Sequence, residues 1–334
     1  MIGTRTPFRM SFIGGGSDLK EFYSRYPGCV ISTTINKYMY IFIHPFFDER
    51  IQVKYSKTEL VNRVEEIKHP IVREVVKKFN LRGIDINSIA DIPSGTGLGS
   101  SSSFTVGLLH ALYAYTHKYV SAEQLARDAC EIEIEKLNEP IGKQDQYASA
   151  YGGFNIIRFY SDGYVNIEPI IVDPLLVETL QNNLLLFYIG SVRKASSVLS
   201  DQKKNIINDD EKFNTLQEMT NLVADMNKCL VESDLNNFGK ILNQNWQLKK
   251  SLSPKISATE IDNIYETGLK NGASGGKLLG AGGGGFILFY CEKKYQHKLR
   301  NSLSKLKELR FNLEKSGSKV IYIGDTLKDK IWQK

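Results

Sequence analysis

The pattern of apolar and polar positions predicts both strands and helices in the first half of the chain. β-Branched and aromatic residues are dense in Cys29–Ile35, Lys37–Pro45 and Ile51–Tyr55, which predicts three strands. Apolar residues recur every three or four positions in Ser101–His117 and Ser121–Leu137, each with a serine near its start. This spacing predicts two consecutive helices.

Shorter segments complete this half. Pro70–Phe79 is predicted to be helical. Gly153–Phe159 and Tyr164–Ile170 are predicted to form a hairpin around Asp162 and Gly163, which make a favourable two-residue turn. We expect the first domain to close near this hairpin.

The second half begins with a predicted strand at Leu184–Ile189, continues through amphipathic helices to about Asn271, and returns to strands at Phe286–Tyr290 and Val320–Ile323. Uneven helical segments between runs of strands lack the regular βαβα alternation of a doubly wound sheet. The chain is therefore predicted to be α+β, with one domain at residues 1–172 and a second at residues 173–334.

Composition supports a folded, two-domain protein. The 334 residues exceed the roughly 100 to 200 typical of one domain, and 42% hydrophobic with 24% charged residues is ordinary for a globular chain. No apolar run approaches the roughly 20 residues that cross a bilayer, and the N-terminal residues lack the apolar core of a secretory signal. We therefore expect a cytoplasmic protein outside the membrane, whose four scattered cysteines are free thiols.

The formal net charge of +6 is spread along the chain, with acidic residues interleaved among the basic ones. A nucleic-acid-binding protein usually concentrates its positive charge in a patch or stripe. The even distribution instead predicts mild attraction for phosphorylated small molecules and no nucleic-acid partner.

Three glycine-rich segments carry candidate chemistry, and the first is Gly14–Asp18, which follows Arg9. Its glycines let the backbone approach a ligand closely, and Asp18 offers an acceptor to a hydroxyl group. Taken alone, a tight turn between strands is the simpler interpretation of this segment.

The second segment, Asp91–Ser103, runs directly into a predicted helix. Glycines free backbone amides to point at phosphate oxygens, and a helix N-terminus supplies unpaired N–H groups and positive potential. A serine N-cap would need only one serine, whereas four follow the alternating glycines. No lysine follows Gly99 as a Walker A motif requires, so the segment predicts a phosphate site of another kind.

The third segment, Lys277–Phe286, matches GxGxxG at Gly280, Gly282 and Gly285. A dinucleotide fingerprint must open a helix, but this run leads into a predicted strand. A glycine loop between two strands that approaches a ligand through its backbone fits better, and a purely structural hairpin stays open. The nearby GxSxG at residues 272–276 follows a helical pattern, which disfavours a serine-hydrolase elbow.

Two carboxylates stand out near the end of the second predicted helix. Glu133 shares a face with the apolar Ala126, Cys130 and Leu137, so it needs either a local cation or a cation or metal in a cleft. For Asp145, which follows a few residues later, a carboxylate favoured by a helix dipole is the simplest interpretation.

Together and in this order, the segments resemble the GHMP small-molecule kinases, the family of galactokinase, homoserine kinase, mevalonate kinase and phosphomevalonate kinase. The residues that match its three motifs are Pro7, Arg9 and Gly14–Asp18, then Pro93, Gly95, Gly97, Leu98, Gly99, Ser100 and Ser101, and finally Gly280–Gly285. Within the family, Arg5–Leu19, residues 142–146 and Lys277–Phe286 look most like the bacterial D-glycero-D-manno-heptose 7-phosphate kinases. The sugar-binding glutamate of galactokinases is missing from the first motif.

The resemblance implies a two-domain α+β fold with a ferredoxin-like second domain and an active site in the cleft between the domains. It implies that Asp145 is the catalytic base, that Arg9 keeps this carboxylate ionised, and that Ser101 and Glu133 hold Mg²⁺. The residues implied to bind ATP are Pro93, Gly95, Thr96, Gly97, Leu98, Gly99, Ser100, Ser101 and Ser102. The residues implied to bind the sugar are Gly15, Gly16, Ser17, Asp18, Lys143, Arg193, Gly282 and Gly283.

The implied reaction transfers a phosphoryl group from ATP to O1 of D-glycero-D-manno-heptose 7-phosphate, for the synthesis of nucleotide-activated heptose and surface polysaccharide. Such a substrate requires a second anion-binding site. Its cation stays open among Arg193, Lys194, Lys249 and Lys250.

Several alternatives remain at this stage. Glu135 is the alternative to Glu133 as metal ligand, and Ser100 is the alternative to Ser101. The sugar could be unphosphorylated, such as fucose, and a non-catalytic nucleotide and sugar sensor would use the same fold. The presence of Asp145 and both metal ligands disfavours the sensor. A homodimer is compatible with the sequence, which leaves the oligomeric state open.

Overall fold

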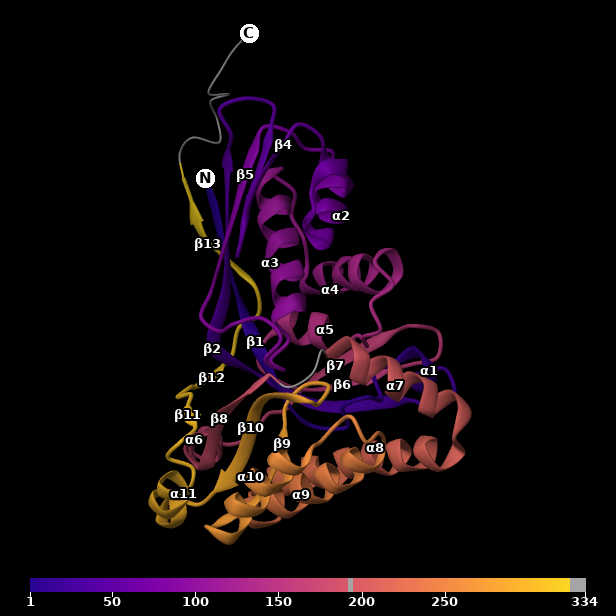
Figure 1. Ribbon diagram of the computed structural model, residues 1–334, viewed down its shortest axis with the longest axis vertical. Coiled ribbons are helices and arrows are strands. Elements are labelled where there is room, and N and C mark those ends of the chain that lie inside the picture. The colour runs from indigo at the N-terminus through magenta and orange to yellow at the C-terminus, as the bar shows by residue number, and fades with distance from the viewer. Residues whose placement is uncertain (192–194, 325–334) are drawn as a thin grey trace.

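The computed structural model describes residues 1–191 and 195–324 and shows two lobes, one above the other in Figure 1. The first lobe carries a long twisted sheet with helices beside it, and the second carries a smaller sheet covered by long helices. Within the described residues, no helix is both long and apolar enough to cross a membrane.

The first lobe is built on β1 (Ile2–Ile13) and β2 (Gly28–Pro45), two long antiparallel strands. β2 is long enough to pair with β5 through one half and with β6 through the other. The remaining strands of this sheet are β3 (Ile51–Lys54), β4 (Thr58–Val61), β5 (Ile84–Ala90), β6 (Phe154–Phe159), β7 (Val165–Pro169), β12 (Leu313–Glu314) and β13 (Lys319–Ile323).

Helices pack against one side of this sheet (Figure 1). α3 (Ser100–Tyr115) lies on β1 and β2 and is buried around most of its circumference, which explains its largely apolar sequence. The other helices of the lobe are α1 (Lys20–Tyr23), α2 (Pro70–Phe79), α4 (Ala122–Cys130) and α5 (Gln144–Tyr151), with a 3₁₀ turn at Val64–Glu66 and a π-helical turn at Glu131–Lys136.

The second lobe has the strand order β11-β8-β10-β9, with every neighbouring pair antiparallel. Its strands are β8 (Leu184–Ser191), β9 (Ala273–Leu278), β10 (Gly284–Cys291) and β11 (Lys307–Glu308). Its helices are α6 (Pro174–Asn183), α7 (Ala195–Asn208), α8 (Asp210–Val231), α9 (Leu235–Ser251), α10 (Thr259–Lys270) and α11 (Gln296–Ser302), with a 3₁₀ turn at Lys293–Tyr295. The chain thus follows the βαββαβ order of a ferredoxin-like domain. The predicted α+β fold is confirmed.

Two elements differ from the sequence prediction. The pattern does not predict β1, because Arg5, Pro7 and Arg9 interrupt its apolar positions and because burial on both faces removes the alternation. The helix predicted over Ser121–Leu137 is divided into α4 and the π-helical turn that follows it. π-Helical turns of this kind are frequent at functional sites.

The chain returns to the first sheet after completing the second lobe. β12 pairs with β2 and β13 pairs with β1. The strand predicted at Val320–Ile323 is therefore present, but it belongs to the sheet of the first lobe. The predicted division into residues 1–172 and 173–334 does not include this return.

Buried contacts join the two lobes beside the first glycine turn. The ring of Phe12 in β1 packs edge-to-face on Phe238 of α9, with centroids 5.4 Å apart. The ammonium of Lys277 in β9 donates a hydrogen bond to the Phe12 carbonyl at 3.0 Å. These contacts hold α9 and β9 against the strand that leads into Gly14–Asp18.

Candidate active site

A cavity of about 290 Å³ lies where the two lobes meet. The first lobe contributes the end of β1, the turn after it, the loop before α3 and the start of α5. The second lobe contributes α7, α9 and the loop between β9 and β10. All three glycine-rich segments of the sequence therefore reach one cavity.

The loop before α3 forms a concave arrangement of backbone amides. Gly95, Gly97 and Gly99 adopt positive φ angles of 75°, 83° and 74°, so left-handed residues alternate with others along the loop. Gly99 is also the N-cap of α3 and supplies no side chain, which leaves the N–H groups of the first turn available to a ligand. Such alternation at a helix N-terminus creates a binding site for phosphate.

The third glycine run supports this loop by direct backbone contact. A Cβ atom on Gly97 would lie 2.4 Å from the Leu279 carbonyl oxygen, and one on Gly285 would lie 2.3 Å from the Thr96 carbonyl oxygen. Only glycine permits this approach. The run connects β9 to β10, as predicted. Its glycines allow the two loops to pack together, and the run also lines the cavity.

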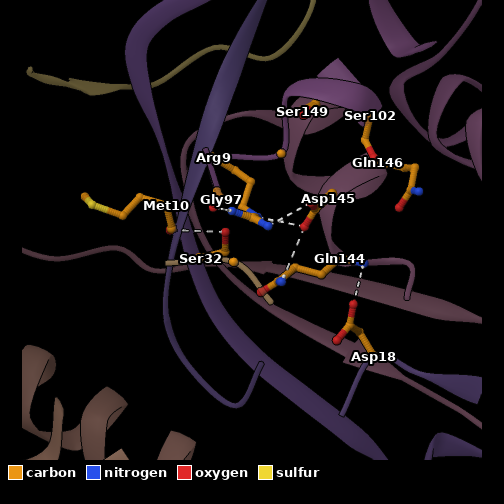
Figure 2. A network of polar contacts seen from close by, with 12 residues as sticks. Arg9, Met10, Asp18, Ser32, Gly97, Ser102, Gln144, Asp145, Gln146 and Ser149 are labelled. Atoms are coloured by element: carbon orange, nitrogen blue, oxygen red, sulfur yellow. Dashed lines mark hydrogen bonds and ion pairs between the residues drawn. The ribbon is translucent and has the colours of Figure 1, made fainter. Parts of the chain in front are cut away.

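The Arg9 guanidinium clamps the Asp145 carboxylate beside the phosphate loop (Figure 2). Arg9 Nε and Nη2 each donate to one oxygen of Asp145 at 2.7 Å, and Nη1 donates to the Gly97 carbonyl at 2.6 Å. Arg9 is buried, whereas Asp145 keeps 24% of its side chain exposed toward the cavity it lines. A Cβ atom on Gly99 would lie 3.2 Å from Asp145 Oδ2, so the carboxylate is adjacent to the loop.

Asp18 connects the first glycine turn to the start of α5. Its Oδ2 accepts a hydrogen bond from the Gln144 N–H at 3.2 Å (Figure 2), and its Oδ1 accepts one from the Gly16 N–H at 3.0 Å. Burial raises the pKa of the Asp18 carboxyl, and the nearby charge of Asp145 raises it further. A Cβ atom on Gly142 would lie 2.1 Å from Asp18 Oδ2, so glycine is required there.

Glu133 is a buried carboxylate that only neutral donors satisfy. It accepts hydrogen bonds from Ser101 Oγ at 2.9 Å, Ser102 Oγ at 2.8 Å and Gln146 Nε2 at 2.7 Å. Burial raises the pKa of its carboxyl, although these donors oppose the shift. No lysine or arginine in the part of the chain that the structure describes forms an ion pair with it. The local cation considered from the sequence is therefore absent from residues 1–191 and 195–324.

The residues near Glu133 fit a magnesium ion. Ser101 lines the cavity and donates a hydrogen bond to Glu133, which is fully buried and does not itself line the cavity. Hydroxyl and carboxylate oxygens are ligands that Mg²⁺ accepts together with phosphate oxygens and water. Glu135, the alternative ligand, is exposed at the surface. Within the described residues, no group of three or more histidine, cysteine or acidic side chains forms a complete metal cage.

Some predicted residues do not reach the cavity. The ammonium of Lys143 donates to the Gly163 carbonyl at 2.8 Å and lies over the Tyr23 ring. Ser17 is buried and exchanges hydrogen bonds with the backbone of Cys29. Five further predicted residues serve the loops rather than line the cavity, namely Pro93, Thr96, Leu98, Gly282 and Gly283. Arg193 and Lys194 lie outside the described residues.

Two buried lysines line the cavity, Lys277, which the sequence does not single out, and Lys249, which it leaves among four candidates. Lys277 precedes the third glycine run, and burial lowers its pKa well below the ordinary value. Lys249 in α9 was one of four candidate cations, and its ammonium donates to the Gly280 carbonyl at 2.6 Å. Nothing in a lysine's local sequence signals burial, so only the tertiary structure distinguishes these two from the many surface lysines.

The chain is similar in sequence to known proteins. Two family models match the chain, the GHMP kinases N terminal domain at residues 60–153 and the GHMP kinases C terminal domain at residues 226–308. The D-glycero-alpha-D-manno-heptose 7-phosphate kinase of Campylobacter jejuni is 30% identical over 91% of this chain and 93% of its own. The bifunctional fucokinase/GDP-fucose pyrophosphorylase of Arabidopsis thaliana is 26% identical over 92% of this chain, which covers 30% of that longer protein.

Solved structures share the architecture. A D-glycero-D-manno-heptose 1-phosphate kinase from Bacteroides thetaiotaomicron superposes with a TM-score of 0.79 at 23% identity, over 97% of this chain and 100% of that one. Galactokinase from Lactococcus lactis, complexed with galactose, superposes with a TM-score of 0.76 at 16% identity, over 95% of this chain and 94% of that one. At these identities the likeness establishes the fold.

Proposed function

Because this chain belongs to the GHMP kinase family of ATP-dependent phosphotransferases with alcohol acceptors, we propose that it phosphorylates O1 of D-glycero-D-manno-heptose 7-phosphate. The product would be the 1,7-bisphosphate, a precursor for nucleotide-activated heptose and surface polysaccharide. The observation that carries the proposal is the Asp145 carboxylate, clamped by Arg9 against the glycine loop before α3. The similarity to the Campylobacter jejuni enzyme supports the choice of sugar.

The triphosphate of ATP occupies the loop that ends at Gly99 in this proposal. Backbone N–H groups of the loop and of the first turn of α3 bind phosphate oxygens without the desolvation cost of a buried cation. Ser101 and Glu133 hold Mg²⁺, which neutralises charge on the phosphate oxygens when it is bound. The remaining work falls to side chains that orient the acceptor and accept its proton.

Asp145 is the proposed general base. Both of its oxygens accept charged hydrogen bonds from Arg9, which fix its orientation toward the cavity. A carboxylate in this position accepts the proton of the attacking sugar hydroxyl, while Arg9 supplies positive charge beside the transferring group. Phosphoryl transfer requires mainly positioning and charge neutralisation, so this small set of groups is adequate.

Asp18 is the proposed sugar anchor. Two backbone N–H groups fix its carboxyl at the cavity wall, and the oxygens can also accept hydrogen bonds from sugar hydroxyls. Gln144 lies beside it with an unpaired, buried Oε1 atom that is suited to a second hydroxyl. Together they offer acceptors to a polyhydroxylated ligand.

A substrate panel tests the proposed function. The purified protein is assayed with ATP and Mg²⁺ against D-glycero-D-manno-heptose 7-phosphate, the unphosphorylated heptose, L-fucose, galactose and mevalonate, with ADP release as readout. We expect the highest kcat/KM for heptose 7-phosphate and a new anomeric phosphate signal in the phosphorus NMR spectrum of the product. Preferential turnover of any other acceptor would overturn the assignment of substrate.

The second candidate is an L-fucose 1-kinase. The similarity to the fucokinase of Arabidopsis thaliana, which extends over 92% of this chain, favours it. In both candidate functions the sugar is phosphorylated at its anomeric oxygen, so Asp145 and the glycine loop would act identically. The heptose candidate carries a phosphate that L-fucose lacks, and the panel contains one acceptor for each.

A further inference from the structure

Hydrogen-bond donors with spare capacity gather around the Gly14–Gly16 turn. Ser11 Oγ and Gln202 Nε2 are buried and have no hydrogen-bond partner among the described residues. Lys249 is 4% exposed, and its ammonium uses one of three donor positions, on the Gly280 carbonyl. All three side chains line the cavity, although they come from β1, α7 and α9.

These three polar atoms lie close to one short stretch of backbone. A Cβ atom on Gly15 would lie 3.8 Å from Ser11 Oγ and 3.9 Å from Lys249 Nζ. One on Gly16 would lie 2.4 Å from Gln202 Nε2. At Gly16 the Gln202 amide thus occupies the place of a side chain, while the Ser11 hydroxyl and the Lys249 ammonium lie beside Gly15. The three groups therefore surround one short stretch of backbone on the wall of the cavity.

The composition of this group favours an anion. Sugar hydroxyls both donate and accept, and the cavity offers them acceptors at Asp18 and Gln144. The Ser11, Gln202 and Lys249 group offers donors and one positive charge. Unpaired buried donors are costly, so their presence indicates a ligand that completes them.

Among the described cations that line the cavity, Lys249 is the one whose ammonium lies beside Gly15. Arg9 donates to Asp145 and Gly97, and Lys277 donates to the Phe12 carbonyl. Lys250, one residue further along α9, pairs with Asp262 at 3.2 Å and does not line the cavity. Among the cations that the sequence left open, Lys249 alone both falls in the described residues and faces the cavity.

We propose that Ser11, Gln202 and Lys249 bind the phosphate group that the acceptor sugar already carries, and that this subsite selects phosphorylated over unphosphorylated sugars. The inference rests on the proposed function, because it assumes a sugar phosphate as acceptor. The γ-phosphate of ATP has the same chemistry, so the test separates these two sources of phosphate.

The test compares acceptor preference in the parent enzyme, Lys249→Gln and Lys250→Gln. Preference is the ratio of kcat/KM for D-glycero-D-manno-heptose 7-phosphate to kcat/KM for the unphosphorylated heptose, measured at saturating ATP. Loss of a charge-assisted hydrogen bond to phosphate corresponds to roughly 10- to 100-fold in this ratio. We expect Lys249→Gln to lower the ratio by that factor and Lys250→Gln to leave it at the parental value.

A second variant tests the subsite independently of Lys249. Gln202→Met keeps the length of the side chain and removes the donor, and we expect it to lower the same ratio by roughly 3- to 10-fold. Thermal unfolding of each variant shows whether it is folded. Isothermal titration of the nucleotide-free parent with heptose 7-phosphate gives a readout without turnover, and Lys249→Gln should weaken that binding.

The outcomes distinguish the two proposals. A parent enzyme that does not prefer the phosphorylated sugar overturns both the proposed substrate and the subsite. If the parent prefers it but Lys249→Gln loses activity equally on both acceptors, the lysine serves the ATP phosphate and the subsite alone is wrong. An unchanged ratio in both Lys249→Gln and Gln202→Met also refutes the subsite alone.

Discussion

The two halves of the cavity are made of different parts of the polypeptide. The half proposed for ATP is mainly backbone, with alternating glycines and the first turn of α3 resting on a second glycine loop. The half proposed for the sugar is mainly side chains, delivered by four elements of both lobes. A backbone site accepts any triphosphate of the right shape, whereas a side-chain site can be changed residue by residue. The difference locates substrate specificity in the second half.

The largest expected effect falls on the residue where the two halves meet. Asp145→Asn keeps the size of the side chain but removes the proton acceptor, and general base catalysis contributes roughly 10²- to 10⁴-fold. We expect kcat to fall by about that factor, while ATP affinity, measured by displacement of a fluorescent nucleotide, changes only a few-fold. Asp162→Asn, in an exposed turn, is the matched control. Comparable kcat in Asp145→Asn and the parent would remove the base role from Asp145.

The backbone half should be sensitive to a single methyl group. In Gly97→Ala the new Cβ would overlap the Leu279 carbonyl, and the positive φ angle adds about 1 to 2 kcal/mol of strain. We expect KM for ATP to rise at least roughly tenfold, since about 1.4 kcal/mol corresponds to a factor of ten. Gly95→Ala is the control, because its positive φ angle is similar but no atom lies within 4 Å of the added Cβ. Equal effects of the two variants would show that loop-to-loop packing is unimportant.

The proposed metal ligands predict a smaller change on the same side. Ser101→Ala removes a hydroxyl oxygen but leaves Glu133 with Ser102 and Gln146 as donors. We expect the Mg²⁺ concentration needed for half-maximal activity to rise several-fold, because one ligand oxygen is lost. A titration with Mg²⁺ at fixed ATP measures this. An unchanged midpoint would argue against Ser101 as a ligand.

The smallest predicted effect is a pH dependence confined to the sugar half. Burial and, to a smaller extent, the charge of Arg9 lower the pKa of Lys249 to about 8, although the charges of Asp18 and Asp145 oppose the shift. Lys277 also lies near it. The ammonium is therefore charged below about pH 8 and neutral above it. We expect kcat/KM for heptose 7-phosphate to decline as pH rises through that value, because this parameter reports the free enzyme. The corresponding decline in kcat should lie at higher pH, because bound phosphate favours the charged ammonium.

Lys249→Arg sharpens this prediction, because arginine stays protonated throughout the range. In that variant the alkaline decline in kcat/KM should disappear, even where the activity at neutral pH is lower than in the parent. Persistence of the same decline would assign it to another group.

The sequence predicts the backbone half better than the side-chain half for a physical reason. Gly95, Gly97 and Gly99 alternate with other residues in one short segment that leads directly into α3. Their spacing alone therefore predicts the phosphate loop. Lys249 and Ser11 meet only after β1 and α9 have packed, and neither residue has a distinctive local pattern. The position of Asp145 beside the loop follows from the resemblance to a family rather than from its neighbours in sequence.

The same contrast holds for the fold. Helices such as Pro70–Phe79 have one apolar face and are predicted with their observed bounds. β1 is buried on both faces and carries polar residues that pair with distant partners, as Arg9 does with Asp145. A local pattern cannot distinguish such a strand from a loop. The packing of the third glycine run on the second likewise depends on a contact between segments far apart in sequence.

The return of β12 and β13 to the first sheet affects the order in which the protein folds during synthesis. β13 pairs with β1, whose residues leave the ribosome more than 300 positions earlier in the 334-residue chain. The first lobe therefore waits for its last strand until the whole second lobe has been translated. An edge of β1 stays unpaired during that time, and such edges are sites of aggregation. We therefore expect the need for chaperones during expression to depend on the time taken to translate residues 184–318. In the described part of that stretch, β12 is the one strand that belongs to the first sheet.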